Sequence, residues 1–325
     1  MTVSADALLA VKDLRVEFPT RHGTLVAVDG VSLSIAPGEV LGVVGESGAG
    51  KSITGLALIG LLEPPGRIAG GEVRLEGRRI DDLPPEPLRR LRGRRIGMVF
   101  QDPLTSLNPL YTVGRQLEET ISTHLALTPK ICREKALNLL KEVGIPGAEQ
   151  RYHHYPHQFS GGMRQRVVIA LALAADPVLL IADEPTTALD VSIQAQIIGL
   201  LKRLAAERGA AVMLITHDMG VIAETAHRVA VMYAGRIVEI GPVREVIHAP
   251  KHPYTAGLMG SIPRISLVEK TRLLQIDGAM PRLNAIPAGC AFNPRCPKRF
   301  DRCGIDRPEL MAAGTSRAAC WLHAA

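Results

Sequence analysis

Aromatic residues are scarce in this chain of 325 residues: they make up 3% of it, with a single tryptophan. Proteins that hold single-stranded nucleic acid use aromatic side chains as stacking platforms, so this scarcity argues against that class. The densest basic run, residues 89–95, contains no aromatic residue. We therefore interpret it as a solvated or membrane-proximal face and expect no nucleic acid partner. The formal net charge of +6 suits contact with nucleotides or anionic headgroups.

Long apolar runs are also missing. The longest, such as residues 167–175, fall well short of the ~20 residues that span a bilayer, so a membrane pore would have to come from other chains. Residues 1–10 include an acidic residue and no basic start, so we expect no secretory signal and a cytoplasmic location. Five cysteines in a cytoplasmic chain argue against disulfides.

The pattern of short apolar runs predicts a doubly wound α/β sheet. Strands are expected at residues 31–35, 40–44, 95–100, 178–182 and 212–216. From about residue 102 to 165 the pattern changes to helices broken by proline and glycine, which predicts a helical insertion. After Gly241 proline becomes frequent and the sheet pattern stops. We therefore expect an α/β domain over residues 1–245 and a C-terminal extension over residues 246–325.

A nucleotide-binding loop follows the second of these strands and opens a helix. Its eight residues fit the pattern G-x-x-x-x-G-K-S: Gly45, Glu46, Ser47, Gly48, Ala49, Gly50, Lys51 and Ser52. The glycines let consecutive N–H groups surround phosphates. Lys51 should reach the β- and γ-phosphates, and Ser52 should bind Mg²⁺. Between a strand and a helix, a chance glycine-rich turn is a poor alternative, so we predict ATP and Mg²⁺ as ligands.

Polar residues that end other strands complete this site. Asp183 ends an apolar strand and is expected near the metal, and Glu184 follows it as a carboxylate able to polarise a water. Helix capping is the alternative for such a pair, and the P-loop makes it the weaker one. Gln101 and His217 each end a predicted strand. They could contact the metal or the γ-phosphate, although such residues are often structural.

A second anion-binding turn lies at Ser160, Gly161 and Gly162, just before an apolar helix. A hydroxyl and bare N–H groups at a helix N-terminus can approach a phosphate closely. With the P-loop already present, the question is whose phosphate this turn contacts.

Together these motifs resemble those of the ATP-binding cassette (ABC) ATPases over roughly residues 8–245. The resemblance implies a P-loop fold with a parallel or mixed sheet and a helical subdomain. It implies Gln101 as the Q-loop residue, Glu184 as the catalytic base and His217 as the γ-phosphate sensor. It also implies a signature at residues 159–163, where Phe159 and Met163 replace the usual leucine and glutamine, and a D-loop at Ala188, Leu189 and Asp190.

In that family two cassettes pack head to tail. The resemblance therefore implies that Ser160, Gly161 and Gly162 contact ATP held on a partner's P-loop. Phe18 is the best candidate for the aromatic residue that stacks on adenine, with a strand-core role as the alternative.

Residues 249–255 and 289–296 resemble the C-terminal region of oligopeptide/dipeptide importer ATPases. This implies the motor subunit of a di-/oligopeptide importer, peripheral at the cytoplasmic face of the inner membrane. The implied partners are a second, non-identical ATPase subunit, two membrane-spanning permease subunits and, through the complex, an extracytoplasmic substrate-binding protein.

Two alternatives remain open. The cargo could be glutathione, a nickel chelate or an antimicrobial peptide. A soluble ABC ATPase acting on DNA or ribosomes would usually carry a coiled-coil insertion or a second cassette, and the sequence shows neither.

The remaining cysteine pattern lies in the C-terminal extension, at Cys290, Cys296, Cys303 and Cys320. The spacing lacks the C-x-x-C pair usual in zinc ribbons and suits a [4Fe–4S] cluster, whose negative charge nearby basic residues could offset. The family resemblance also implies such a cluster. Zinc and unliganded thiols are the alternatives. Cys132 is expected to be a small buried residue.

Overall fold

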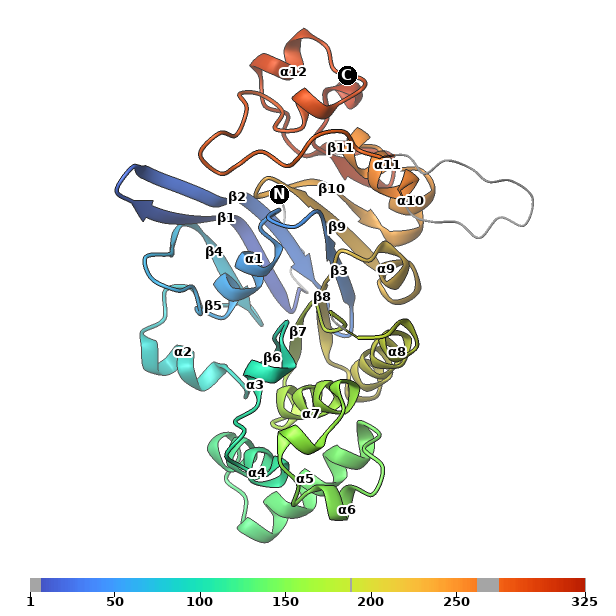
Figure 1. The fold of residues 1–325 in the computed structure, drawn as a ribbon. Helices are drawn as coiled ribbons and strands as arrows, with labels where there is room; N and C mark the ends of the chain where they lie inside the picture. Colours follow the sequence, from blue (N-terminus) through green and yellow to red (C-terminus); the bar gives the residue numbers. More distant parts are fainter. Residues whose placement is uncertain (1–6, 188, 262–274, 325) are drawn as a thin grey trace, which may run out of the picture. The chain divides into compact units, whose positions relative to one another are not determined.

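The computed structural model describes residues 7–187, 189–261 and 275–324 (Figure 1). The chain forms two compact units, and each is assembled from several segments. The first contains Met1–Leu9, Ile35–Glu39 and Leu75–Leu214. The second contains Ala10–Ser34, Val40–Arg74 and Ile215–Ala325.

The first unit holds a parallel part of the sheet with helices packed on it. The strands of this part are β6 (Ile96–Val99), β7 (Leu179–Asp183) and β8 (Ala211–Ile215), and the short strand β5 (Arg78–Arg79) does not belong to it. β7 lies between β6 and β8, and β6 pairs with β7 in parallel, with Val99 opposite Ala182. Every residue of β7 and β8 is buried. This matches the continuous apolar runs of the sequence, because strands of a parallel sheet are covered on both faces.

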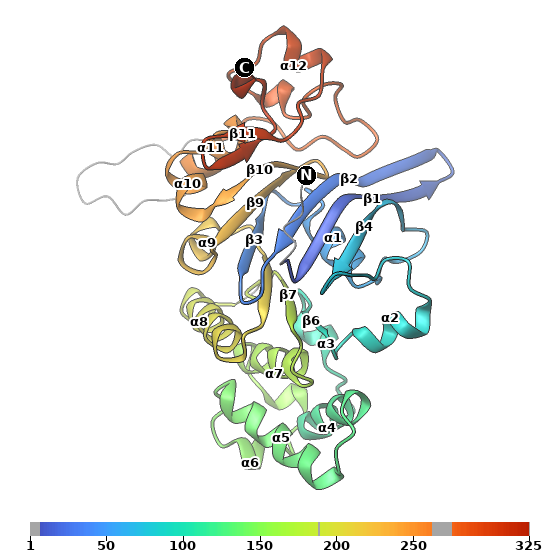
Figure 2. The same cartoon turned by 180° about the vertical axis from the view of Figure 1, so that it is seen from behind.

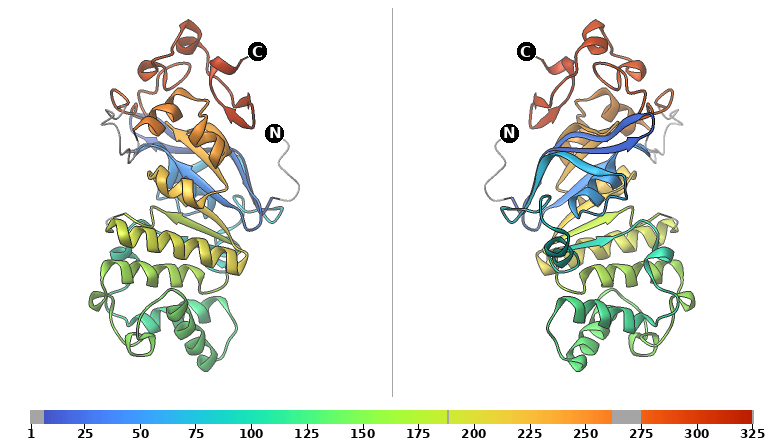
Figure 3. Two further views of the ribbon diagram at one scale, coloured as in Figure 1. Left: turned by 90° about the vertical axis from the view of Figure 1, so that its right-hand side faces the viewer. Right: turned by 90° about the vertical axis from the view of Figure 1, so that its left-hand side faces the viewer.

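Helices make up the rest of the first unit. They are α2 (Pro85–Leu91), α3 (Pro103–Ser106), α4 (Val113–His124), α5 (Pro129–Glu142), α6 (Ala148–Arg151), the 3-10 turn η1 (Pro156–Gln158), α7 (Gly161–Leu173) and α8 (Val191–Arg208). Thr112 and Thr128 cap α4 and α5 with their hydroxyls, as threonine does at helix starts. Figure 3 shows α7 and α8 side by side.

The chain between β6 and β7 is helical, and its last helix runs past the predicted limit at residue 165. α7 begins inside the predicted range of 102–165 and ends at Leu173. Its second half is buried, including Val167, Val168 and Ile169. Because a helix that is covered all round has no polar face, its sequence does not show where the insertion ends.

The second unit contains two sheets. One has the strand order β2-β1-β4, made of β1 (Leu9–Thr20), β2 (Gly23–Ile35) and β4 (Arg67–Leu75) (Figure 2). In the other, β3 (Val40–Val44) pairs in parallel with β9 (Arg228–Tyr233), and β10 (Arg236–Pro242) pairs with β9 in antiparallel. Helices α1 (Lys51–Leu58), α9 (Met219–Thr225), α10 (Val243–His248) and α11 (Pro253–Gly260) complete this part. Parallel and antiparallel pairs together confirm the predicted mixed sheet.

The C-terminal region continues this sheet, which the sequence did not predict. Strand β12 (Ser316–Ala318) pairs with β10, with Ala318 opposite Glu239, and β11 (Met311–Ala313) pairs with β12. With three residues each, these strands are too short to show an alternating pattern. The region also contains the turns η2 (Asn293–Arg295) and η3 (Trp321–His323) and helix α12 (Asp301–Ile305).

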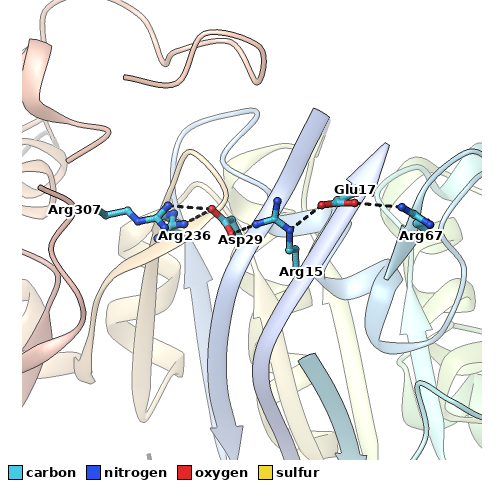
Figure 4. A network of polar contacts seen from close by, with 6 residues as sticks. All are labelled: Arg15, Glu17, Asp29, Arg67, Arg236 and Arg307. Carbon is cyan, nitrogen blue, oxygen red and sulfur yellow. Dashed lines mark hydrogen bonds and ion pairs between the residues drawn. The ribbon is translucent and has the colours of Figure 1, made fainter. Parts of the chain in front are cut away.

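A chain of ion pairs centred on Asp29 joins segments of the second unit that are far apart in the sequence (Figure 4). The Asp29 carboxylate in β2 pairs with Arg15 of β1 at 2.7 Å, with Arg236 of β10 and with Arg307 of the C-terminal region at 3.2 Å. Arg15 also contacts Glu17 at 2.8 Å. The C-terminal region is thus tied to the core by charge as well as by strand pairing.

Within the part of the chain that the structure describes, no helix is both long and apolar enough to cross a membrane.

Candidate active site

The nucleotide-binding loop lies in the second unit, between β3 and α1. Gly45 leaves β3 with a φ of 155°, and Gly50 caps α1 with a φ of 98°. A Cβ on Gly45 would lie 2.3 Å from the carbonyl oxygen of Met232 in β9, so a side chain is excluded there. The first N–H groups of a helix have no partner inside the helix, and those of α1 follow directly on this loop. The loop and the helix start thus form an arrangement able to bind phosphate.

The side chain of Lys51 folds back on the loop. Its Nζ donates to the carbonyl oxygens of Gly45 at 2.9 Å and Glu46 at 3.0 Å, and the residue is only 5% exposed. Ala49 is buried, whereas Ser47 and Gly48 are exposed at the tip of the loop. These two acceptors are neutral carbonyl oxygens, and the charged oxygens of a phosphate would form a stronger hydrogen bond with the ammonium group than they do.

His217 lies in the same unit, in the exposed turn after β8. The preceding residue, Thr216, donates its N–H to the carbonyl oxygen of Val43 at 3.1 Å, two residues before the P-loop. Asp218 then caps α9 by accepting from Gly220 at 2.8 Å. His217 and the P-loop therefore emerge at the same edge of this sheet.

The acidic residues lie in the first unit, at the end of β7. Asp183 is the last residue of the strand and is buried. Glu184 follows with a φ of 44°, a left-handed conformation that costs a non-glycine residue free energy and is found at functional turns. Its Oε2 atom accepts from Thr187 Oγ1 at 2.8 Å and from Gln101 Nε2 at 3.3 Å. The structure thus brings Gln101 and Glu184 together at the ends of two neighbouring strands.

The signature turn, also in the first unit, opens α7. The Ser160 hydroxyl accepts from the N–H of Met163 at 3.3 Å, while Ser160 and Gly161 are exposed. A Cβ on Gly162 would lie 2.7 Å from Ile193 of α8, so glycine lets α7 pack closely there. The sulfur of Met163 accepts a hydrogen bond from Arg151 Nη1 at 3.1 Å. Of the predicted D-loop, Ala188 lies outside the described residues.

Phe18 lies near the end of β1 and is half-buried. A Cβ on Gly66, just before β4, would lie 2.6 Å from the ring, so the ring rests against that turn. This contact fits a structural role as well as a stacking role.

The four cysteines of the C-terminal region line one cavity, together with His252 and Phe292 among others. Burial is the main cause that raises the pKa of Cys290 to about 11, and the charges of the other three cysteines contribute to this rise. Burial likewise raises the pKa of Cys296 and Cys320. The shared cavity brings the four thiols near one another, and a cation among their thiolates would relieve the repulsion between them.

The four thiols supply the type of donor atom that a thiolate-bound group requires. Among the described residues, no three histidine, cysteine or acidic side chains stand in a ready metal-binding arrangement. Cys132 is buried in α5, as its position in the sequence predicted.

Three further residues contact these sites, and the sequence alone did not indicate them. Thr187 donates to Glu184, as described above. Tyr254 and Arg295 both contact Glu46 of the P-loop from the C-terminal region. The sequence motifs around Tyr254 and Arg295 resemble the family's C-terminal region, but they contain no signal that either residue contacts the P-loop.

A P-loop, a strand-end carboxylate pair and a signature turn on a mixed α/β sheet define an ATP-binding cassette ATPase. Residues 28–187 match the ABC transporter family, and residues 238–303 match the family "Oligopeptide/dipeptide transporter, C-terminal region". A dimeric ATP-binding cassette in a post-hydrolysis state, bound to ADP and Pi, is similar in structure. Its TM-score is 0.65 at 33% identity, over 73% of this chain and 99% of that one.

Two relatives match nearly the full length. The dipeptide transport ATP-binding protein DppD of Escherichia coli is 47% identical, over 97% of this chain and 96% of the relative. The oligopeptide transport ATP-binding protein OppD of Escherichia coli is 49% identical, over 97% and 93%. The chain belongs to the ATP-binding proteins of the oligopeptide/dipeptide ABC transporter family. It is an ATP-hydrolysing subunit that acts within a transporter complex.

Proposed function

We propose that this chain hydrolyses ATP to drive the uptake of dipeptides and oligopeptides through separate membrane subunits. The observation that carries the proposal is the combination, in one chain, of a complete cassette with the cysteine-bearing C-terminal region. The relatives that share both parts over nearly their whole length are named for dipeptide and oligopeptide transport.

The proposed roles at the nucleotide follow the resemblance of these motifs to those of the ABC ATPases. Lys51 and the N–H groups of the P-loop hold the phosphates, and Phe18 stacks on the adenine. Ser52, Gln101 and Asp183 would hold Mg²⁺, which supplies positive charge against the phosphates. His217 contacts the γ-phosphate.

Glu184 is the proposed base that takes a proton from the attacking water. Thr187 and Gln101 both donate to its Oε2 atom, so they fix the orientation of the carboxylate. A carboxylate held in one orientation needs no rearrangement when the water attacks.

Ser160, Gly161 and Gly162 are assigned to ATP bound on a partner's P-loop. The support is that they form an exposed helix start in a chain that already has its own phosphate loop. The proposed partner is a second, non-identical ATPase subunit. Two membrane-spanning permease subunits and an extracytoplasmic binding protein complete the complex, with this chain peripheral at the cytoplasmic face of the inner membrane. We place the functional boundary between the cassette, residues 1–245, and the extension, residues 246–325.

Transport by the whole complex in vesicles tests the cargo. ATP-dependent uptake of a labelled dipeptide is expected, and it should be lost when this subunit carries Lys51→Ala. Uptake of glutathione, a nickel chelate or an antimicrobial peptide in place of dipeptides would contradict the peptide assignment. Copurification with DNA or ribosomes in place of permease subunits would favour a non-transport role.

Cys290, Cys296, Cys303 and Cys320 are the proposed ligands of a [4Fe–4S] cluster, supported by their common cavity. Such a cluster supplies iron atoms that bind four thiolates and cross-link a loop-rich segment. Iron and sulfide analysis after anaerobic purification tests this. Iron and sulfide in equal amounts are expected, with both lost in Cys303→Ser. Stoichiometric zinc, or no metal, would contradict the proposal.

A further inference from the structure

Glu46, the second residue of the P-loop, is held on three sides by groups of the second unit. Its N–H donates to the hydroxyl of Tyr254 at 2.9 Å. Its carbonyl oxygen accepts from Lys51 at 3.0 Å. Both oxygens of its carboxylate accept from Arg295 Nη1 at 3.1 Å. Two of these three contacts come from the C-terminal region.

Tyr254 is fixed firmly enough to position the loop. It is fully buried, and its ring packs on Tyr233 with 4.7 Å between centroids. Its own N–H donates to His252 Nδ1 at 3.1 Å, and the N–H of His252 donates to the buried Glu239 at 2.8 Å. Burial raises the pKa of Tyr254, so its hydroxyl keeps its proton at neutral pH.

Arg295 links the P-loop to the loop that carries two of the four cysteines. It stands between Cys290 and Cys296, and its side chain is 8% exposed. Besides Glu46, it donates to the carbonyl oxygen of Asp277 at 2.8 Å and contacts the Tyr233 hydroxyl at 3.3 Å. An ion pair this shielded from water is screened far less than a surface pair.

The cysteine loop in turn sets the position of Arg295. The side chain of Asn293 donates to the carbonyl oxygen of Cys290 at 2.8 Å, and the N–H of Cys290 donates to Cys303 at 2.9 Å. Phe292 packs on Tyr233, with 5.3 Å between ring centroids. A shift of this loop therefore moves the guanidinium group that holds Glu46.

We propose that Arg295 and Tyr254 are positioning residues for the P-loop, through which the cysteine loop of the C-terminal region sets the affinity for nucleotide. The proposal rests on ATP binding at the P-loop, as proposed above. Lys51 donates to the carbonyl oxygens of Gly45 and Glu46, and the N–H of Glu46 belongs to the same peptide group as the Gly45 carbonyl. Releasing the N–H or the carboxylate of Glu46 therefore lets these peptide groups rotate. That rotation displaces the ammonium group that meets the phosphates. Neither residue touches the reacting atoms.

The test measures the Kd of a fluorescent ATP analogue, together with kcat and KM, in full-length variants. Arg295→Ala and Tyr254→Phe should each raise Kd and KM by roughly five- to twentyfold while kcat at saturation stays within about twofold. Arg295→Lys, which keeps the charge, should recover part of the loss. In the double variant with Glu46→Gln, Arg295→Ala should add less than it does alone, because Glu46→Gln already removes the charge of the same ion pair.

Arg307→Ala is the matched control. It also removes an ion pair between the C-terminal region and the core, but Asp29 keeps Arg15 and Arg236 as partners (Figure 4). Its Kd should stay within about twofold of the parent. Melting temperatures report whether each variant folds, and if Arg295→Ala does not, Arg295→Lys and Glu46→Gln carry the test.

Three results would overturn the proposal: an unchanged Kd in Arg295→Ala, an equal loss in Arg307→Ala, or fully multiplicative effects in the double variant. Lys51→Ala separates this from failure of the proposed function. If Lys51→Ala still binds and hydrolyses ATP normally, the P-loop assignment itself fails. If Lys51→Ala loses ATP binding while Arg295→Ala and Tyr254→Phe keep it, the P-loop assignment is supported and the positioning role of Arg295 and Tyr254 is wrong.

Discussion

Replacing Thr187 with valine tests the orientation of the proposed catalytic base. Valine keeps the shape of the side chain but removes the hydroxyl that donates to Glu184 Oε2 at 2.8 Å. A hydrogen bond to a charged group contributes about 1.5–3 kcal/mol. Glu184 is half-exposed and keeps the longer hydrogen bond from Gln101 at 3.3 Å. We therefore expect Thr187→Val to lose only about 1 kcal/mol of this free energy. Since 1.36 kcal/mol corresponds to a tenfold change in rate, kcat should fall roughly fivefold.

Phosphate release at saturating MgATP measures this effect, with the Kd of ATP measured in parallel. Thr187→Val should lower kcat and leave Kd unchanged, because Thr187 acts on the base and not on the P-loop. Thr187→Ser keeps the hydroxyl and should retain most of the activity. A kcat within twofold of the parent for Thr187→Val, or an equal loss in Thr187→Ser, would refute this role.

Three glycine substitutions test the backbone geometry. Gly45→Ala should lower the free energy of unfolding by roughly 2–4 kcal/mol and weaken nucleotide binding, because its Cβ would lie 2.3 Å from a backbone oxygen of β9. A Cβ on Gly48 would meet nothing within 4 Å, so Gly48→Ala should lose only about 1–2 kcal/mol from the left-handed backbone conformation. Equal losses of stability for Gly45→Ala and Gly48→Ala in thermal or denaturant melts would refute the close contact at Gly45. Gly241→Ala should loosen β12, because its Cβ would lie 2.2 Å from Ser316 Oγ. Faster amide exchange in residues 311–318 is the expected result, and an unchanged rate would show that β10 and β12 do not pack this closely.

The nucleotide motifs could be predicted because each depends on local geometry. Glycines fix the P-loop, and buried strands place Gln101 and Glu184 at their ends. Since these strands are neighbours, the contact between the two residues follows from the topology. The α/β fold could be predicted because buried parallel strands form short continuous apolar runs, and the cassette fold because its motifs resemble those of a known family.

Contacts over long sequence separations could not be predicted. Arg295 lies 249 residues from Glu46, and nothing in either local sequence indicates that they pair. Strands β11 and β12 are too short for a pattern, and the fully buried second half of α7 hides the end of the helical insertion. Each of these depends on packing with a distant segment, which a single sequence does not display.

The central claim is that this chain hydrolyses ATP with Glu184 as the base. The most direct measurement is multiple-turnover phosphate release by Glu184→Gln, together with ATP binding, in the assembled transporter. We predict that this variant binds ATP as tightly as the parent and releases almost no phosphate. Substantial steady-state turnover in Glu184→Gln would contradict the account.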